Sequence, residues 1–223
     1  MSDTKDTKDT MTNEPWSDRA ELYRTSTAHS QGPDLDLVVE WAEGCRTAID
    51  VATGGGHVAR RLREAGLEVV SSDPAPGMRP DVICFAEELP FADSSFDLAV
   101  TRVAAHHFAD VPQSTRELGR VASERVIVVD TTFMGEDVER AETLRDPSHV
   151  RNYSEEEWRL FFAGAGIEVE EVRFFSTPID FQEWLDRTEC TGETAEEVRT
   201  LFGDRVADGM LTLDRIALRG TPS

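Results

Sequence analysis

Three consecutive glycines in the stretch "AIDVATGGGHVARRL" constrain the fold of this chain more than any other feature. Gly54, Gly55 and Gly56 lie between an apolar run that contains Asp50 and an amphipathic segment rich in arginine. Glycine loses more conformational freedom on folding than any other residue, so three of them after a strand indicate a turn that lets the backbone approach a ligand closely. The helix that follows would present unpaired amide groups at this point.

Apolar runs and helical patterns alternate along the chain, which is typical of a doubly wound α/β fold with a mostly parallel sheet. We expect strands at residues 47–53, 67–73, 81–86, 96–104, 125–133, 167–175 and 211–220. We expect helices at residues 17–30, 34–44, 56–65, 111–121, 154–166, 180–189 and 194–208, with Asp34 and Ser154 as N-caps. The sequence therefore predicts a disordered polar tail at residues 1–15 and one domain over residues 16–223, with a small helical insertion at about 179–209.

The acidic composition limits the partners that we expect. The chain has 23 basic and 44 acidic residues, which gives a formal net charge of −21. Because such a surface repels phosphate backbones and anionic membranes, we expect neither nucleic acid nor a membrane as a partner. No apolar run approaches membrane-spanning length, and residues 1–15 lack the apolar core of a signal peptide, so a cytoplasmic protein is expected.

The histidines, carboxylates and cysteines show no spacing typical of a metal site. Cys45, Cys84 and Cys190 are far apart in the sequence, and we expect them to be reduced. His106 and His107 are adjacent, and on a strand their side chains would point to opposite faces. We therefore predict that no metal is bound.

A second carboxylate supports a nucleotide-like ligand at the glycine turn. The second expected strand ends at Asp73, 23 residues after Asp50, where a carboxylate can accept hydrogen bonds from the hydroxyls of an adenosine ribose. Gly54 to Ala59 also fits the pattern G-x-G-x-x-A, so a nicotinamide-dependent oxidoreductase stays an alternative. A tight turn with a purely structural role is a further alternative.

Longer segments distinguish these alternatives, namely "AIDVATGGGHVA", "SSDPAPGM", "AEELPFADSSFDLAVTRVAAHHFADV" and "RDPSHVRNYSEEEWRLFFAGAGIEVEEV". In them the chain resembles the class I S-adenosylmethionine-dependent methyltransferases, in the ubiquinone/menaquinone-methyltransferase-like branch (methyltransferase type 11). The resemblance covers about residues 23–172. It implies a Rossmann-like, seven-stranded, mostly parallel sheet whose antiparallel last strand lies next to the sixth. It also implies transfer of a methyl group from S-adenosylmethionine to a small-molecule acceptor.

The resemblance further implies which residues contact the cofactor. Asp50 and glycines 54–56 would face its methionine part, Asp73 would bind the ribose, and Ala86 with Glu87 would flank the adenine. The full set of implied cofactor residues is Asp50, Ala52, Thr53, Gly54, Gly55, Gly56, Asp73, Pro74, Met78, Ala86, Glu87 and Arg102.

Two departures from the family pattern bear on cofactor binding. Only "PAPGMRP" separates Asp73 from the third strand, so one crossover helix is shortened to a turn or lost. Phe85 stands where relatives often have an aspartate for the adenine amino group. These departures motivate an alternative function, a methyltransferase-shaped protein that binds a nucleoside or small ligand without methyl transfer.

A catalytic base is needed only if the methylated group is protonated at the working pH. His106 and His107 follow the fourth strand and an imidazole titrates near neutrality, so both are candidates; His107 is preferred because the family has a similar "HHF". Tyr23 and His29 lie on the entry segment that folds over the cofactor in relatives, and we expect them to contact the substrate or form a lid. A homodimer is a candidate assembly, with a second copy covering the sheet edge beyond the third strand.

Overall fold

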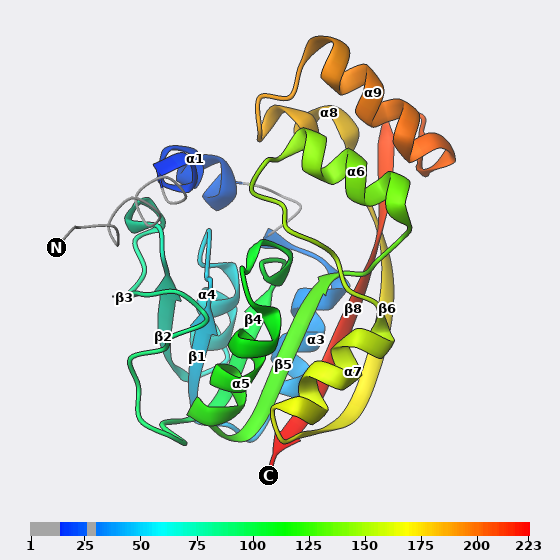
Figure 1. The fold of residues 1–223 in the computed structure, drawn as a ribbon. Helices are drawn as coiled ribbons and strands as arrows, with labels where there is room; N and C mark the ends of the chain where they lie inside the picture. The colour runs from blue at the N-terminus through cyan, green and yellow to red at the C-terminus, as the bar shows by residue number, and fades with distance from the viewer. Residues whose placement is uncertain (1–13, 26–29) are drawn as a thin grey trace, which may run out of the picture.

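The computed structural model describes residues 14–25 and 30–223, and it has the expected α/β architecture (Figure 1). Residues 1–13, which make up most of the expected tail, and His29 lie outside the described residues. Within residues 14–25 and 30–223, no helix combines the length and the apolar composition needed to cross a lipid bilayer.

One twisted sheet forms the centre of the fold. Its strands are β1 (Thr47–Val51), β2 (Glu68–Asp73), β3 (Val82–Ile83), β4 (Phe96–Arg102), β5 (Ala122–Thr131), β6 (Ile167–Asp180), β7 (Val206–Ala207) and β8 (Met210–Pro222). They lie in the order β3-β2-β1-β4-β5-β8-β6, and the short β7 pairs with β8. Strands β1 to β5 pair in parallel, whereas β8 runs antiparallel between β5 and β6. The predicted fold class, including the antiparallel last strand beside the sixth, is confirmed.

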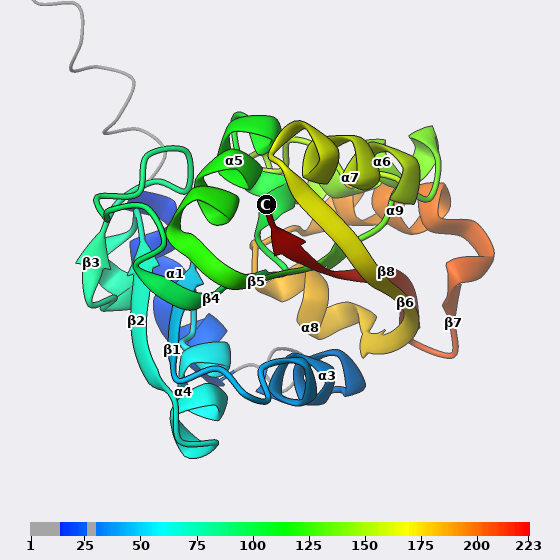
Figure 2. The ribbon, with the colours of Figure 1, turned by 90° about the horizontal axis from the view of Figure 1, so that it is seen from below.

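Helices cover both faces of this sheet and one end of it. They are α1 (Glu14–Thr25), α3 (Pro33–Trp41), α4 (His57–Glu64), α5 (Val111–Val121), α6 (Glu136–Arg145), α7 (Glu155–Gly164), α8 (Phe181–Asp186) and α9 (Gly192–Phe202), with 3-10 turns η1 (Pro76–Met78), η2 (Ala105–His107) and η3 (Gly203–Arg205). Helices α3 and α4 lie on one face, and α5 and α7 lie on the other (Figure 2). Helices α6, α8 and α9 share a separate apolar core near the ends of β6 and β8, and we call these three helices the cap.

The central strands are buried on both faces because successive residues contribute to two different cores. In β1, Ile49 packs in the core that contains residues of α5 and α7, and Ala48 packs in the core that contains residues of α3 and α4. A strand covered on both faces needs a continuous apolar run, which explains "VIVV" in β5. The parallel strands end at a common edge, so the polar residues that follow them gather there.

The structure corrects the expected start of the second helix. Asp34 is not its N-cap, because Gly32 holds that position and Pro33 is the first helical residue. Asp34 therefore falls in the first turn and is fully buried, and its carboxylate binds Arg102 and Arg215. Ser154 does cap α7 as predicted, in a capping box with Glu157.

Two connections bear directly on the site. Between β2 and β3 the chain forms only the 3-10 turn η1, which confirms the predicted loss of a crossover helix. Helix α6, between β5 and α7, has no counterpart among the expected helices. It completes the cap by packing against α9.

Candidate active site

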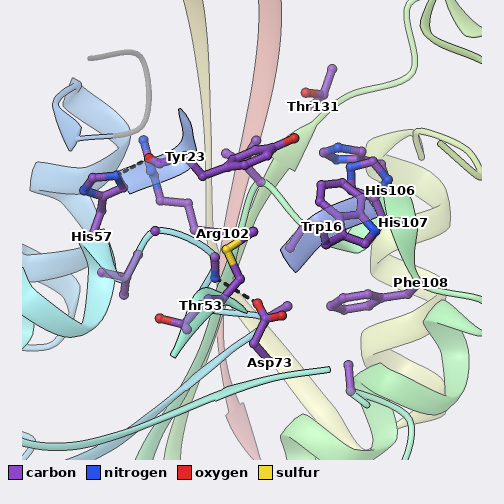
Figure 3. A pocket seen from close by; sticks show the side chains of 18 of the residues that line it. Trp16, Tyr23, Thr53, His57, Asp73, Arg102, His106, His107, Phe108 and Thr131 are labelled. Atoms are coloured by element: carbon purple, nitrogen blue, oxygen red, sulfur yellow. Dashed lines mark hydrogen bonds between the residues drawn. The ribbon is translucent and has the colours of Figure 1, made fainter. Parts of the chain in front are cut away.

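A cavity of about 280 Å³ lies at the edge where the parallel strands end (Figure 3). The strand order reverses here, because β1 lies between β2 and β4, and doubly wound sheets bind ligands at such a point. Every expected cofactor residue except Gly56 lines the cavity, and so do Tyr23, His106 and His107. The structure does not test the expectation for His29, which lies outside the described residues.

The three glycines have separate structural reasons. Gly54 and Gly56 have φ angles of +51° and +74°, which residues with a side chain rarely adopt. A Cβ on Gly54 would meet no atom within 4 Å, so the backbone here borders the open space of the cavity. Gly55 instead allows α1 to approach, because a Cβ there would lie 2.7 Å from the carbonyl oxygen of Tyr23.

Asp73 is held against the glycine turn by its own hydrogen bonds. Its Oδ2 accepts a hydrogen bond from the amide of Gly54 at 2.9 Å, and its Oδ1 accepts one from the amide of Ala75 at 2.9 Å. Burial raises the pKa of Asp73, and these two hydrogen bonds offset only part of that rise. Each carboxylate oxygen has two lone pairs, so the group keeps the capacity to accept hydrogen bonds from a pair of hydroxyls.

Asp50 is a second buried carboxylate at the same edge. Its Oδ2 accepts hydrogen bonds from the hydroxyl of Thr53 at 2.5 Å and from the amide of Ala59 at 3.0 Å. Burial raises the pKa of Asp50 to about 6, although both hydrogen bonds act in the opposite direction. A cationic group bound in the cavity would favour the ionised form of this carboxylate.

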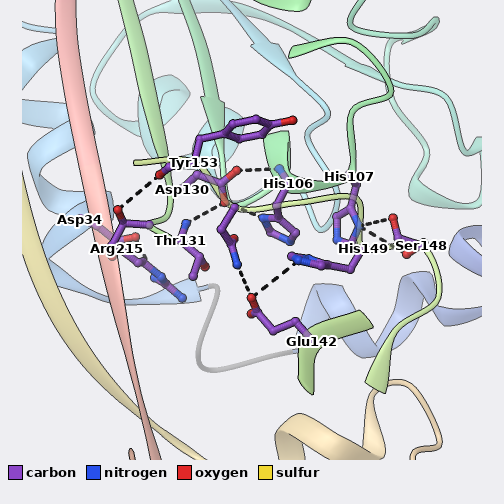
Figure 4. Close-up of polar contacts among 12 residues, drawn as sticks. Asp34, His106, His107, Asp130, Thr131, Glu142, Ser148, His149, Tyr153 and Arg215 are labelled. Carbon is purple, nitrogen blue, oxygen red and sulfur yellow. Dashed lines mark hydrogen bonds and ion pairs between the residues drawn. The ribbon is translucent and has the colours of Figure 1, made fainter. Parts of the chain in front are cut away.

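His106 and His107 both lie on η2 and line the cavity (Figure 3). The expectation that their side chains point apart is wrong, because η2 is a 3-10 turn and the ring centroids lie 4.1 Å from each other. His106 Nδ1 lies 2.6 Å from Oδ1 of Asp130, and Oδ2 accepts a hydrogen bond from the His106 amide at 2.8 Å (Figure 4). Since Nδ1–H donates to the carboxylate, the proton-accepting atom of the neutral ring is Nε2.

The pKa values of the two histidines shift in opposite directions. Burial lowers the pKa of His106, but the charge and hydrogen bond of Asp130 outweigh it and raise the pKa above its ordinary value. Burial and the neighbouring His106 hold the pKa of His107 well below its ordinary value. His107 Nδ1 donates to the carbonyl oxygen of Ser148 at 3.0 Å. The geometry favours His106 over the expected His107 as a base.

Asp130 is a functional candidate that the sequence reasoning missed. It lies near the carboxyl end of β5, where its carboxylate also accepts a hydrogen bond from the amide of Thr131 at 2.8 Å. The position of Asp130 in the sequence could have identified it, because Asp50 and Asp73 likewise lie at the carboxyl ends of β1 and β2. An acidic residue that ends an apolar strand of a parallel sheet marks this edge.

Beyond His106 the cavity continues beneath the cap. The residues that line this end come from β5, β6, β8 and the cap, and they are Thr131, Glu142, Arg145, Ile179, Trp184, Arg187, Leu213 and Arg215. They mix apolar side chains with guanidinium groups. The cavity therefore reaches from the glycine turn to the cap.

A polar cluster lies behind His106 (Figure 4). Ligand atoms of Glu139, Glu142 and His149 lie within 4.8 Å of one another, a spacing that can hold a metal ion. In the structure, however, His149 Nε2 lies 3.1 Å from Oε2 of Glu139, and Asn152 donates hydrogen bonds to both carboxylates. The absence of a bound metal stays a prediction.

Helix α1 covers the cavity on the side of η1. The Trp16 ring lies edge-on to His107, with 4.5 Å between ring centroids, and Tyr23 lines the cavity nearby (Figure 3). His57 Nε2–H donates to the carbonyl oxygen of Tyr23 at 2.9 Å, and Ser17 Oγ accepts from the amide of Gly77 at 3.0 Å. Tyr23 thus lies over the cavity, where the expected lid would be.

Comparisons with known proteins agree with this geometry. A family model described as a methyltransferase domain matches residues 49–129. The chain is similar to the uncharacterised methyltransferase YcgJ of Bacillus subtilis, with 32% identity in an alignment that covers 85% of each chain. It is also similar to the uncharacterised protein YafE of Escherichia coli, with 35% identity in an alignment that covers 59% of this chain and 72% of that one.

Solved structures give the same result. The crystal structure of YcgJ from Bacillus subtilis superimposes with a TM-score of 0.78 and 27% identity, covering 85% of this chain and 97% of that one. The structure of BH2331 from Bacillus halodurans superimposes with a TM-score of 0.75 and 28% identity, covering 86% of this chain and 100% of that one.

Proposed function

This chain belongs to the class I S-adenosylmethionine-dependent methyltransferases, and we propose that it transfers a methyl group from S-adenosylmethionine to a small molecule. Membership in this family decides against the nicotinamide alternative. The observation that carries the proposal is the arrangement of Gly54 and Asp73, with an open backbone beside a carboxylate tied to it.

The residues at this end of the cavity fit an adenosyl group. A Cβ on residue 54 would occupy the open space that borders the cavity, and glycine leaves that space to a ligand. The Asp73 carboxylate would accept hydrogen bonds from the ribose hydroxyls. Phe85 is 40% exposed and lines the same end with Ala86, so it presents an apolar surface for the adenine ring. Asp50, at the carboxyl end of β1, would face the cationic methionine part.

When bound, S-adenosylmethionine supplies a methyl group on a sulfonium, whose sulfur keeps the electron pair of the broken bond while the acceptor's pair forms the new one. The protein itself aligns the acceptor and excludes water. His106 would take the acceptor's proton at Nε2, and the buried Asp130 would stabilise the resulting imidazolium. Tyr23 on α1 and Trp184 on α8 both line the cavity and would shield it from solvent.

Enclosure supports a small acceptor. The end of the cavity beyond His106 is bounded by residues of α6, α8, β6 and β8, and α1 lies over its other end. A reactive group on a large macromolecule would have to displace these elements to reach His106. The net charge of −21 further disfavours nucleic acid as the acceptor.

Calorimetry with S-adenosylmethionine and S-adenosylhomocysteine tests the proposal. We expect micromolar binding of both, and loss of at least about tenfold in affinity for Asp73→Ala, which removes the acceptor of ribose hydrogen bonds. The exposed Asp93→Asn serves as a control with unchanged affinity. Absence of heat at millimolar ligand with the wild-type protein would contradict the proposal.

A further inference from the structure

Guanidinium groups gather at the end of the cavity that lies under the cap. Arg145 at the end of α6, Arg187 just after α8 and Arg215 in β8 all line it. Among the described residues that line this end, Glu142 is the acidic one. The concentration of positive charge is notable in a chain with only 23 basic residues against 44 acidic ones.

Carboxylates contact two of these guanidinium groups. Arg215 Nη1 and Arg102 Nε contact the same oxygen of Asp34, at 2.8 Å and 2.9 Å, so one negative charge serves two positive ones. Arg145 Nη1 lies 4.0 Å from Oδ2 of Asp146, which is the outer limit of an ion pair. Neither of these two contacts is a close ion pair between one carboxylate and one guanidinium group.

Burial is the main influence on the pKa values of these guanidinium groups. Burial, followed by the charges of Arg145 and Arg215, lowers the pKa of Arg187 to about 10. Burial also lowers the pKa of Arg145, although Tyr23, Asp146 and Glu142 act in the opposite direction. A guanidinium with a lowered pKa gains stability when an anion binds beside it.

Arg145 is positioned rather than mobile. Its Nε–H donates to the carbonyl oxygen of Trp184 at 3.0 Å, and its guanidinium lies 4.2 Å from the centre of the Trp184 ring. Trp184 stacks in turn on Phe181 within the core of the cap. A planar guanidinium held in one orientation binds a carboxylate through two parallel hydrogen bonds better than a flexible cation does.

The neighbouring surface is apolar. Ile179, Trp184 and Leu213 line the cavity together with the guanidinium groups. Such a surface accommodates a hydrocarbon or aromatic body but offers it few hydrogen bonds.

Resting on the proposed methyl transfer, we propose that the acceptor is a small carboxylic acid with an apolar body. Arg145 and Arg187 bind its carboxylate under the cap, Trp184 and Leu213 contact its body, and its reactive group faces His106.

Paired probes test this assignment. We would measure binding of benzoate and of its neutral isostere benzamide by calorimetry and thermal shift, with and without saturating S-adenosylhomocysteine. We expect benzoate to bind at least about tenfold more tightly than benzamide, and Arg145→Gln and Arg187→Gln to remove this preference. Arg140→Gln, an exposed arginine on the same helix α6, should retain it.

Three outcomes would overturn the assignment. Equal binding of benzoate and benzamide, or binding of neither, excludes a carboxylate site. Tighter binding of inorganic phosphate than of benzoate assigns the guanidinium groups to a tetrahedral oxyanion. Weaker binding of S-adenosylhomocysteine to Arg145→Gln, with unchanged binding of methylthioadenosine, assigns them to the carboxylate of the cofactor. If S-adenosylhomocysteine fails to bind to the wild type while benzoate binds, only the proposed function fails.

Discussion

Ionisation of Asp50 would favour binding of a cationic group, but it lowers the stability of the fold. It is fully buried, and only neutral groups, the hydroxyl of Thr53 and the amide of Ala59, contact its Oδ2. Its pKa rises from 3.8 to about 6, so the folded protein binds a proton more readily than the unfolded chain does. The unfolding free energy must therefore fall as the pH rises through this interval.

Replacement of Asp50 by Asn should remove that dependence. The pKa difference corresponds to about 3 kcal/mol at most, all of it lost above pH 6. We expect Asp50→Asn to raise the unfolding free energy by about 2 kcal/mol at pH 8 and to weaken S-adenosylmethionine binding. Urea unfolding at pH 4 and pH 8 measures the effect. If the variant and the wild type differ in stability by the same amount at both pH values, ionisation of Asp50 is not the cause.

The contact between His106 and Asp130 makes a prediction at the same scale. Asp130→Asn removes the negative charge that raises the pKa of His106, whereas Glu142 and Asp146, the other charges that raise it, remain. We expect the His106 ring to titrate at lower pH in this variant than in the wild type. Proton NMR of the histidine rings measures it, and the exposed Asp204→Asn is a control. An unchanged His106 titration would exclude Asp130 as the cause.

Among the elements, helix α1 can pack where it does because two residues in other parts of the chain are glycines. A Cβ on Gly55 would lie 2.7 Å from the carbonyl oxygen of Tyr23, and one on Gly77 would lie 2.5 Å from Cα of Ser17. The Arg24 guanidinium also donates to the carbonyl oxygen of Gly77 at 2.9 Å. The turn that replaces the missing crossover helix therefore serves as the docking surface for α1.

Gly77→Ala should release α1 from this surface, because its Cβ overlaps the α1 backbone rather than a flexible side chain. We expect faster amide exchange in α1. We also expect at least about threefold weaker binding of S-adenosylhomocysteine, because contacts between α1 and the ligand worth about 1 kcal/mol are lost. Gly164→Ala is the matched control, because a Cβ there meets nothing within 4 Å. Hydrogen exchange and calorimetry measure both; unchanged exchange in α1 would contradict the docking role.

Elements with a strong periodic pattern were predictable from the sequence, and elements set by tertiary contacts were not. The strands, the glycine turn and α7 with its Ser154 cap follow from local chemistry. Helix α6 escapes such reasoning because only Val138, Ala141 and Glu142 are buried in it, so its apolar face is short.

The same division holds within the site. The residues around Gly54 and Asp73, which we propose to bind the cofactor, could be predicted to line a cavity because they follow strands in a recognisable motif. Of the predicted set, Gly56 does not line the cavity. The end under the cap could not be predicted. Arg145 lies at the end of α6 and Arg187 just after α8, and the packing of both helices depends on the whole cap. Asp34 was misplaced because an aspartate before an apolar helix is typical of an N-cap, whereas here Pro33 begins the helix.

In the molecule as a whole, Asp34 connects parts of the chain that are far apart in sequence. Its carboxylate on α3 contacts Arg102 at the end of β4 and Arg215 in β8, and all three side chains are buried. Burial raises the pKa of Asp34, but Arg102 and Arg215 outweigh it and hold the pKa below its usual value. The contribution of this group to stability is therefore present at neutral pH and lost as the pH falls through the lowered pKa.

Asp34→Asn should destabilise the protein by about 3 to 5 kcal/mol at pH 7, because it removes the charged carboxylate that two buried guanidinium groups contact. Asp36→Asn on the same helix breaks only an exposed pair with Arg61 and should change stability by less than about 1 kcal/mol. Chemical denaturation of both variants provides the measurement. Equal changes in stability for the two variants would show that the buried contacts of Asp34 with Arg102 and Arg215 contribute no more than an exposed ion pair.

The position of β8 has a consequence for synthesis on the ribosome. Residues 210–222 emerge after every other strand, yet they lie between β5 and β6. Until they arrive, both of those strands present unpaired edges, which are prone to aggregation and suited to chaperone binding. Leu213 and Arg215 reach the cavity with this same segment. A nascent chain therefore acquires its complete sheet and its proposed acceptor pocket in one late step.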